Sequence, residues 1–548
     1  MPSLWATIIF LCLVSWAAYK LILISKETKR IRAEAAMRGC LPAPTLHSNN
    51  LLGTSRLKES IQANKEDRGP QYVVSAMNEL GPEIHTVRVP VFNSELLVTR
   101  DPENARAIFS TQAADFDISP TRAMAFMPLM GSGIFTATGE AWKHSRALVR
   151  PQFSHEEVAN LDLEERHVQN LLRHLEPSAD GWTAKVDMAP LCWQFTLDTT
   201  TEFLYGQSVN SLLPGEDSKV FGGGITGAEF DDHLNEAKHF VDKRGALARY
   251  YWLIKWSKAS REFNARCAEI HRVVDRMIDE RLRETRNEKD FEKPSTNQRT
   301  FVLLDELAKL TQNRAELRSE TLHILIAGRD TTGALLGWVF YMLARYPAVY
   351  AELRRVILAQ FGNSSTGVNF KDLRNCQYLQ YCLNETIRIV SIVPMNERVA
   401  LRDTTLPRGG GPDGNSPIFV PKDNQVLIPN YAMQHRPDLW GEDPDVFRPE
   451  RWEGRKTGFE FIPFGAGPRK CLGRKYSLLS FAFPVGYTDR RPPIEQFAYT
   501  EAGYLIVRFL QKFDKCENME GPGRIRLHTA IENRSGTGVQ VRFHAAEL

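Results

Sequence analysis

The chain begins with an unbroken apolar run. Leu4 to Ile24 reads LWATIIFLCLVSWAAYKLILI, and Lys20 is the single charged residue among these twenty-one. A helix of that length spans about 30 Å, which matches the hydrocarbon thickness of a bilayer. The pattern therefore predicts a membrane-spanning anchor within residues 1–25.

The charges beside this run favour a retained anchor over a secretory signal peptide. No Lys or Arg precedes the run, whereas Lys26, Lys29, Arg30 and Arg32 follow it. A signal peptide usually has basic residues before a shorter run and a small-residue cleavage site after it. By the positive-inside rule, the remainder of the chain faces the cytosol. Residues 26–44, which end in Leu-Pro-Ala-Pro, are predicted to form a basic, proline-containing linker.

The patterns that follow predict a mostly helical α+β body with a minor sheet. Helical periodicity dominates Glu156–Leu358 and includes one long helix over about Glu316–Arg345. Ile84–Val98 predicts a short strand pair, and Thr405–Ile428 predicts further strands around a glycine loop. Amphipathic segments resume directly after each Gly/Pro-rich or polar stretch, so these predict surface loops rather than domain linkers: Phe221–Gly227, Arg286–Arg299 and Arg408–Pro417.

Composition narrows the function classes. With 43% hydrophobic and 25% charged residues, the 548-residue chain is neither disordered nor a polytopic membrane protein. Its net charge of +3 gives no electrostatic case for nucleic acid. Eight cysteines without a Cys-x-x-Cys pair are too sparse for a disulfide scaffold and favour a reducing compartment.

The candidate chemistry is concentrated around Cys471, within the sequence FGAGPRKCLG. A thiolate that binds a metal needs a fixed approach and partners for its charge. Glycines allow tight turns whose N–H groups can point at the sulfur, an arginine adds positive charge, and a phenylalanine can cover a ring face. These positions are Phe464, Gly465, Gly467, Arg469 and Gly473.

The pattern Phe-x-x-Gly-x-Arg-x-Cys-x-Gly resembles the cysteine loop of the cytochrome P-450 superfamily, the haem-thiolate monooxygenases. Phe464, Gly467, Arg469, Cys471 and Gly473 carry the match. The resemblance implies the P-450 fold, a large helical domain with small β-sheets, over residues 45–548. It also implies that Cys471 is the axial iron ligand of haem b (iron protoporphyrin IX). A thiolate ligand donates electron density that favours O–O cleavage.

A second motif is Glu385-Thr-Ile-Arg388, which matches the superfamily's Glu-x-x-Arg. Helical i,i+3 spacing places both charges on one face. The later segment Phe447–Trp452 is the expected partner, and the resemblance implies that Arg451 completes a buried Glu385–Arg388–Arg451 network. The implied role is folding and support of the haem loop.

A third motif, Ala327-Gly-Arg-Asp-Thr-Thr332, lies within the long predicted helix. Gly328 and the hydroxyl groups can open the helix ladder and admit water. The resemblance assigns Thr331 and Asp330 to delivering the protons that O–O cleavage needs, with Thr332 as a second hydroxyl. The alternative is that these polar residues simply bend the helix.

Residues for the haem propionates follow from the same resemblance. Trp142-x-x-x-Arg146 matches a propionate-contacting motif, since a guanidinium forks naturally onto a carboxylate. Arg398 is a second propionate candidate, and His435 fits a position near the haem edge. His144 is an alternative iron ligand, although an imidazole is more often a structural donor.

The substrate class is predicted from the resemblance of three short sequence segments to known enzymes. Gly131–Phe135 with the Trp142 helix, together with Ala327–Thr332 and Asn396–Arg398, resembles the fungal n-alkane and fatty-acid hydroxylases most. Their substrates are long, apolar and lipid-partitioned, which suits a membrane anchor. The candidate pocket residues, each of which can equally be ordinary core, are Phe126, Met127, Leu129, Met130, Ile326, Ile392, Val393 and Met395.

The resemblance implies that electrons come from NADPH through a separate flavoprotein, the NADPH–cytochrome P-450 reductase, with cytochrome b5 as a second candidate donor. No Gly-x-Gly-x-x-Gly that opens a helix is present to bind NADPH or FAD in this chain. Basic residues near the thiolate are candidates for docking the acidic reductase, or else form a solvated face: Lys143, Arg150, Arg469, Lys470, Arg474 and Lys475.

One segment departs from the superfamily pattern. Two residues are expected between Gly473 and the helix that begins near Phe497, but twenty-three are present, so twenty-one are surplus. The insertion segment, residues 475–495, contains three prolines and an apolar run without amphipathic periodicity. As a loop it is expected to push the helix after it away from Cys471 and to weaken haem binding.

We interpret the insertion segment as an unspliced intron. Twenty-one residues correspond to sixty-three nucleotides in frame. Arg474-Lys475-Tyr476 can encode the donor-like GTAAGT, Thr488-Asp489 the branch-like CTGAC, and Ile494-Glu495 an acceptor-like AG. Removal from that donor to that acceptor restores a Gln codon ahead of Gln496. A genuine surface loop is the alternative.

Together these features predict a single-pass endoplasmic-reticulum enzyme with a cytosolic catalytic domain. It would be an NADPH- and O₂-dependent monooxygenase that hydroxylates a C–H bond of an n-alkane or a fatty acid. Three alternatives stay open: another lipophilic or secondary-metabolite substrate, a haem-thiolate isomerase or dehydratase that needs neither O₂ nor a reductase, and a haem-poor inactive product of the interrupted loop. The Asp330-Thr331 pair argues against the isomerase, which needs no proton relay for O₂.

Overall fold

The structure is a computed structural model that describes residues 2–50, 53–91, 94–154, 161–214, 224–290, 301–472 and 497–547. The chain forms two compact units. The first combines residues 1–59, 73–117 and 397–429, and the second combines residues 60–72, 118–396 and 430–548. Each unit is assembled from distant parts of the chain, so the sequence boundary at residue 45 does not separate them.

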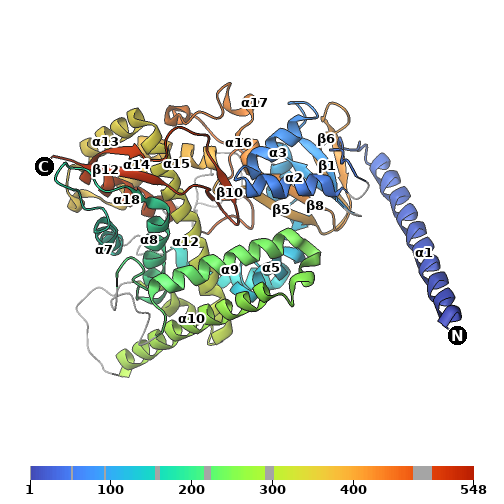
Figure 1. Cartoon of the computed structure of the whole chain (residues 1–548), viewed down its shortest axis with the longest axis horizontal. Coiled ribbons are helices and arrows are strands. Elements are labelled where there is room, and N and C mark those ends of the chain that lie inside the picture. Colours follow the sequence, from blue (N-terminus) through green and yellow to red (C-terminus); the bar gives the residue numbers. More distant parts are fainter. Residues whose placement is uncertain are drawn as a thin grey trace, which may run out of the picture. The chain divides into compact units, whose positions relative to one another are not determined.

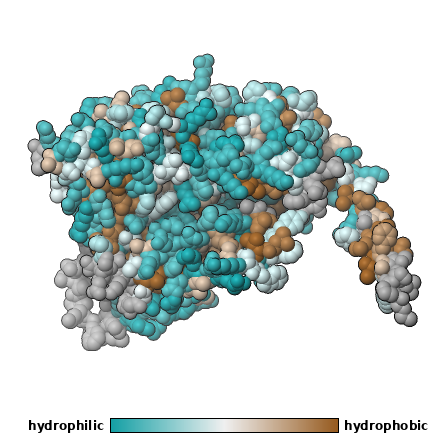
Figure 2. Space-filling view, viewed as in Figure 1, coloured by the Kyte–Doolittle hydropathy of each residue, from teal (hydrophilic) through white to brown (hydrophobic). Residues whose placement is uncertain are grey.

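The apolar run forms the helix α1 (Pro2–Met37), which is longer than the predicted anchor. Its stretch Ile8–Met37 is long and apolar enough to cross a membrane. Figure 2 shows apolar atoms along this helix, where Ile9, Phe10 and Leu13 are more than half exposed. An apolar helix surface that no protein covers is what a membrane span requires.

The predicted linker, residues 26–44, is bonded to the first unit at both of its ends. Its first part continues α1, and Arg30 lies 2.5 Å from Asp403 of the same unit. Its end follows the sheet, because the Leu41 N–H bonds to the Pro417 carbonyl and the Arg88 N–H bonds to the Pro44 carbonyl. The prolines lack an N–H, so apart from the Leu41 N–H it is the carbonyl groups of this end that bond to the sheet.

The first unit contains a five-stranded sheet in the order β1-β2-β8-β5-β3. The predicted strand pair is present, with β1 and β2 antiparallel and Val87 opposite Val98. Strand β8 runs parallel to β2 and follows the antiparallel hairpin β6–β7, as the glycine-loop pattern predicted. The strands are β1 (Thr86–Val91), β2 (Ser94–Thr99), β3 (Phe116–Asp117), β5 (Met395–Ala400), β6 (Thr404–Gly410), β7 (Ser416–Val420) and β8 (Gln425–Pro429).

Helices dominate the second unit, as the periodicity predicted (Figure 1). The principal helices are α5 (Pro120–Met130), α6 (Gly139–Val149), α7 (Leu161–Leu172), α8 (Met188–Tyr205), α9 (Gly227–Leu247), α10 (Lys258–Asp290), α11 (Leu303–Leu310), α12 (Arg314–Arg345), α13 (Pro347–Phe361), α14 (Phe370–Asn375), α15 (Gln377–Val390) and α18 (Phe497–Lys512). Shorter helices are α16 (Asn430–Gln434) and α17 (Pro437–Trp440), and the helices α2 (Thr54–Lys65), α3 (Gly69–Asn78) and α4 (Pro102–Arg106) lie earlier in the chain.

The long helix α12 is the centre of this unit. Its N-cap Asn313 accepts hydrogen bonds from the N–H groups of Ala315 and Glu316, so the helix begins two residues before the predicted start. Most of its residues are buried on every side, which is how a helix without one polar face is stabilised. Helix α8 packs along it (Figure 1), and small residues permit the close approach, since a Cβ at Gly333 would overlap Trp193.

Two small sheets complete the second unit. Strand β12 (Gln540–Ala545) pairs antiparallel with both β4 (Val186–Asp187) and β9 (Phe513–Asn518). The hairpin β10 (Leu527–Thr529) and β11 (Asn533–Ser535) is tied to α12 because the Trp338 indole N–H donates to the Asn533 carbonyl, 2.9 Å away. The mostly helical α+β fold with small sheets is therefore confirmed.

Candidate functional site

The cysteine loop closes on itself before α18. Gly465 and Gly467 have φ values of +66° and +68°, which suit glycine and turn the chain tightly. The Cys471 N–H then donates to the Phe464 carbonyl, 2.9 Å away. The loop therefore fixes the backbone that carries the thiol; Gly473, the last residue of the motif, lies outside the described residues.

Helix α6 and the loop are joined by two guanidinium groups that share one indole. The Arg469 Cζ lies 4.5 Å from the Trp142 ring centroid, and the Arg146 Cζ lies 5.6 Å from the same centroid. Arg146 also donates to the Lys470 carbonyl at 3.2 Å, and Arg469 donates to the Ala137 carbonyl at 2.9 Å. The Trp-x-x-x-Arg motif and the cysteine loop, which lie more than 300 residues apart, therefore meet in one cluster.

This cluster makes the surroundings of Cys471 cationic. Burial lowers the pKa of Arg146, and the like charges of Arg150 and Arg469 lower it further. The sulfur of Cys471 acts in the opposite direction and raises it. Cations beside a thiol stabilise its thiolate. Among the eight cysteines, Cys471 is exposed, Cys12 is exposed on α1, and the other six are buried.

The donor set fits a haem. Its iron needs an accessible thiolate, which Cys471 provides, and its propionates need guanidinium or indole donors, which Trp142, Arg146 and Arg469 provide. His144 is excluded from this set, because it is 62% exposed and its Nε2 lies 2.8 Å from Glu316. Cys471 is thus the axial-ligand candidate.

Helix α18 packs on the start of the cysteine loop. The Tyr499 ring meets the Phe464 ring edge-on at 5.4 Å, and its hydroxyl donates to Asn384 at 2.7 Å. Two residues later, burial raises the pKa of Glu501 to about 8 although the Thr199 hydroxyl donates to it at 2.5 Å. The expectation that the insertion segment pushes this helix away is wrong. Loop closure costs little more for a long connection than for a short one, so the apolar face of α18 still directs its docking. The insertion segment itself lies outside the described residues.

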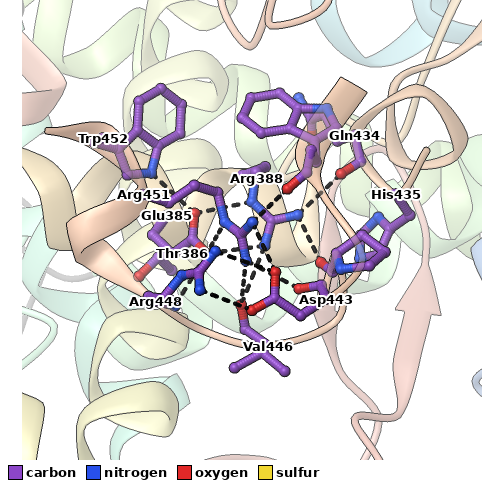
Figure 3. Close-up of polar contacts among 12 residues, drawn as sticks. Glu385, Thr386, Arg388, Gln434, His435, Asp443, Val446, Arg448, Arg451 and Trp452 are labelled. Carbon is purple, nitrogen blue, oxygen red and sulfur yellow. Dashed lines mark hydrogen bonds and ion pairs between the residues drawn. The ribbon is translucent and has the colours of Figure 1, made fainter. Parts of the chain in front are cut away.

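The predicted network around Glu385 is present and buried (Figure 3). Arg388 forms a two-bond fork to Glu385 with distances of 2.8 and 2.9 Å, and the Arg451 Nε lies 3.2 Å from the same carboxylate. The Trp452 indole N–H and the Arg448 backbone N–H donate to it at 2.9 and 3.0 Å. Both carboxylate oxygens are therefore fully engaged, and Glu385 and Arg388 have no exposed surface.

The remaining guanidinium hydrogens meet backbone carbonyls. Arg388 donates to Gln434 and Pro444 at 3.0 and 2.7 Å, and Arg451 donates to Asp443 at 2.9 Å. The network therefore joins α15 to the segment 434–452, which leads directly into the cysteine loop. A second Glu-x-x-Arg, Glu352–Arg355 on α13, has the same spacing but lies on the surface. The i,i+3 spacing alone therefore does not distinguish the buried Glu-x-x-Arg pair from the surface pair.

The contacts of the other two haem-side candidates are with nearby residues of their own units. His435 stacks on Tyr431 with centroids 3.9 Å apart and bonds to its carbonyl through Nδ1 at 2.8 Å. Burial and the charge of Arg388 lower the pKa of His435 to about 3, so the ring is neutral beside the Glu385 network. Arg398 belongs to β5 in the first unit, where its guanidinium lies 4.8 Å from the Phe109 ring centroid and donates to the Glu397 carbonyl.

The third motif lies in the middle of α12, which stays helical throughout. The Thr331 hydroxyl donates to the Ala327 carbonyl at 2.7 Å, and the Thr196 hydroxyl of α8 donates to the Arg329 carbonyl at 2.8 Å. These bonds compete for carbonyls of the helix ladder. Thr332 is buried, whereas Thr331 is half-buried, so Thr331 is the more accessible of the two hydroxyls.

Asp330 is held by cations that the sequence analysis missed. Its Oδ1 lies 2.5 Å from Arg329 and 2.7 Å from Lys238 of α9. Burial opposes the charge of Arg329, but the carboxylates of Asp231 and Asp330 raise its pKa. Arg329 also bonds to Asn235 at 2.9 Å. Lys238 is 92 residues before Asp330, so no local spacing could have revealed this contact.

The candidate pocket residues divide by burial. Phe126, Leu129, Met130 and Ile326 belong to one apolar cluster that also contains residues of α9 and α10, while Ile392 is buried and Val393 half-buried. Met127 and Met395 are exposed.

The basic residues predicted to dock the reductase also differ in their surroundings. Lys143 pairs with Glu140 at 2.6 Å and Arg150 is exposed, whereas Arg474 and Lys475 lie outside the described residues.

Comparisons with known proteins identify the family. A profile of the cytochrome P-450 family matches residues 60–480. The chain is 37% identical over 535 residues to a cytochrome P-450 monooxygenase of a Fusarium species, covering 96% of this chain and 89% of that relative. It is 40% identical over 474 residues to cytochrome P-450 52A5 of Candida maltosa, with 84% and 83% covered.

Solved structures show the same fold. The haem domain of cytochrome P-450DA superposes with a TM-score of 0.66 at 20% identity, covering 92% of this chain and 97% of that one. A second crystal structure, of a mutant of that domain, gives a TM-score of 0.67. At this identity the likeness concerns the fold alone.

Proposed function

Because the chain belongs to the cytochrome P-450 family of haem-dependent monooxygenases, we propose that it hydroxylates a C–H bond of a long-chain apolar compound, an n-alkane or a fatty acid. The observation that carries this proposal is the cationic cluster that holds the exposed thiol of Cys471 beside α6. The likeness of three motifs to the fungal n-alkane and fatty-acid hydroxylases supports the substrate class, as does the apolar cluster beside α12.

The chain's own residues would hold the cofactor from two sides. Cys471 would bind the iron of haem b through its sulfur, with Phe464 and Gly467 shaping the loop. Trp142, Arg146 and Arg469 would hold the propionates, with Arg398 and His435 as further candidates. The haem, when bound, supplies the redox chemistry that activates O₂.

The Glu385–Arg388–Arg451 network supports this site from outside. Its hydrogen bonds fix the segment that leads into the cysteine loop, so its role is to orient the loop. Thr331 and Asp330 would hold and pass protons, and Thr332 is the second hydroxyl. A half-buried hydroxyl next to a buried carboxylate is suited to that task.

Electrons would come from NADPH through a separate flavoprotein reductase, with cytochrome b5 as a second donor. The exposed side chains of Lys143 and Arg150 on the α6 side offer positive charge for docking. The helix α1 would anchor the enzyme in the endoplasmic-reticulum membrane, with the catalytic body in the cytosol and its substrate in the lipid.

Replacement of the thiolate tests the proposal most directly. Cys471→His should abolish the red-shifted carbonyl band of thiolate-ligated ferrous haem, because imidazole donates less electron density than thiolate. Cys12→Ser, at the other exposed cysteine, should keep the band. A Cys471→His protein that retains it would exclude Cys471 as the ligand.

The substrate and the reaction are tested separately. A panel of n-alkanes and fatty acids should yield hydroxylated products only when NADPH, O₂ and the reductase are all present. Product formed without the reductase would indicate a haem-thiolate isomerase or dehydratase instead. Turnover of another lipophilic class alone would reject the alkane and fatty-acid proposal.

We further propose that residues 475–495 are a translated intron. The family match ends at residue 480, inside this segment, and the helix that follows the segment, α18, packs on Phe464. The mature transcript should lack the sixty-three nucleotides, and the shortened chain should bind at least as much haem per protein. A mature transcript with all sixty-three, and a fully haem-loaded long chain, would make the segment a surface loop.

A further inference from the structure

A buried lysine on α9 lies between two buried carboxylates from distant parts of the chain. Lys238 is 3% exposed, and its Nζ lies 2.7 Å from Oδ1 of Asp330 on α12. The same nitrogen lies 3.3 Å from Oε1 of Glu532, in the turn between β10 and β11. Burial of such charges is costly, and an apolar side chain would fill the space more cheaply, so this arrangement calls for a functional reason.

Each carboxylate has one bonded and one free oxygen. Oδ2 of Asp330 and Oε2 of Glu532 are buried and have no hydrogen-bond partner among the residues that the structure describes. Buried polar atoms in folded proteins are nearly always bonded. The two free oxygens lie at either end of the Lys238 contacts, which is where a proton could enter and leave this chain of groups.

A further titratable group lies on the same helix as Lys238. Asp242 lies one helical turn after Lys238 on α9 and is half-buried. Burial and the charge of Glu532 raise the pKa of Asp242 to about 7, while Lys238 and Arg534 oppose that shift. A carboxyl group that titrates near neutrality can take protons from water and release them. The other charged groups around Lys238 are Asp231 of α9, Arg329 of α12 and Arg534 of β11.

We propose that Lys238 passes protons from Glu532 to Asp330, and so feeds the Asp330–Thr331 pair from Asp242. This inference rests on the proposed monooxygenase function. Each transfer moves one proton: the ammonium of Lys238 gives a proton to the Asp330 carboxylate, and the resulting amine regains one from Glu532. Glu532 is then reprotonated from solvent through Asp242. No other bond changes, and the electrons come from the reductase.

Two substitutions at Lys238 separate proton transfer from simple charge pairing. Lys238→Met removes the charge and the proton, whereas Lys238→Arg keeps the charge on a group that does not deprotonate in proteins. Both variants should make roughly tenfold less product per NADPH and release hydrogen peroxide instead. Lys243→Met, on the exposed side of the same helix, should behave as wild type. If Lys238→Arg formed as much product per NADPH as wild type (full coupling), proton transfer through Lys238 would be overturned.

Hydrogen peroxide in place of NADPH and O₂ distinguishes this inference from the proposed function. Peroxide brings its own protons, so wild type and Lys238→Met should form equal amounts of product from it. Equal coupling with NADPH in both proteins would overturn the role of Lys238 while the monooxygenase function stands. No product from wild type in either reaction would overturn both proposals.

A thermal-unfolding cycle tests the contacts without turnover. Glu532→Gln leaves the Lys238–Asp330 pair intact and is the variant to use if Lys238→Met folds poorly; it should also lower coupling. If Lys238 bonds Glu532, the fall in unfolding temperature for the double variant should be less than the sum of the two single falls. Additive falls would overturn the contact on which the proton path depends.

Discussion

Two buried charge clusters in the second unit differ in how completely their carboxylates are bonded. The closed cluster is Glu385 with Arg388, Arg451 and Trp452; both of its carboxylate oxygens accept hydrogen bonds (Figure 3). The open cluster is Lys238 with Asp231, Arg329, Asp330 and Glu532, in which Asp330 and Glu532 each keep an unbonded oxygen. Both clusters are buried, so exposure does not explain their difference.

The difference indicates two uses for buried charge. A fully bonded carboxylate has no site left for a proton, and every bond in the closed cluster fixes backbone position. An incompletely bonded carboxylate raises the free energy of the fold but can accept a proton. The closed cluster therefore suits support of the cysteine loop, and the open cluster suits proton movement beside Thr331.

The largest expected effect is at the closed cluster. Glu385→Gln leaves Arg388 and Arg451 buried with their shared carboxylate removed, so the free energy of unfolding should fall by about 3 kcal/mol or more. Thermal unfolding and the haem-to-protein ratio measure the loss. Haem content should fall together with stability, since the cluster positions the segment that leads into the loop.

The chain provides a matched control for this substitution. Glu352→Gln breaks a Glu-x-x-Arg pair with the same spacing, but Arg355 and Glu352 are 67% and 41% exposed. An exposed pair contributes about 0–1 kcal/mol, so this variant should unfold like wild type. Equal losses at the two positions would show that burial does not set the closed cluster apart.

The closed cluster was predictable from sequence and the open cluster was not. Glu385, Arg388 and Arg451 occur in motifs, and helical spacing brings the first two together. Lys238 and Glu532 carry no motif and are separated by 294 residues, so only the tertiary fold joins them. The strand pairs and α12 followed from patterns, whereas the contact of Trp142 with the cysteine loop did not, because no local spacing joins segments more than 300 residues apart. The docking of α18 on Phe464 did not follow either, because the insertion segment interrupts the expected spacing.

A smaller effect on stability, but a clear effect on chemistry, is expected at Thr331. Its hydroxyl bonds only to the Ala327 carbonyl among the described contacts, and alanine is the better helix former, so Thr331→Ala should unfold close to wild type. Loss of the hydroxyl should lower product per NADPH several-fold and raise hydrogen peroxide release. Assays of NADPH, product and peroxide measure the coupling.

The control for Thr331 lies on the same helix. The Thr321 hydroxyl donates to the Leu317 carbonyl at 2.8 Å, the same i−4 bond, but it lies ten residues before Thr331. Thr321→Ala should leave coupling unchanged. Unchanged coupling in Thr331→Ala as well would remove Thr331 from the proton path and weaken the contrast between the two clusters.

The smallest expected effect is the pH dependence of the open cluster. Asp242 has a pKa of about 7 in the folded chain against an ordinary value of 3.8, so between these values the folded state binds more protons than the unfolded state. Linkage then requires its contribution to stability to be present at low pH and to be lost as the pH rises through about 7. Asp242→Asn removes this contribution. Between pH 6 and 8, wild type should therefore lose about 1 kcal/mol relative to the variant, measured by thermal unfolding. Asp232→Asn, at an exposed neighbour on α9, should show the same change of stability with pH as wild type. If Asp242→Asn also showed the same change as wild type, Asp242 would not titrate with the cluster, and the outer end of the proton path would have to lie elsewhere.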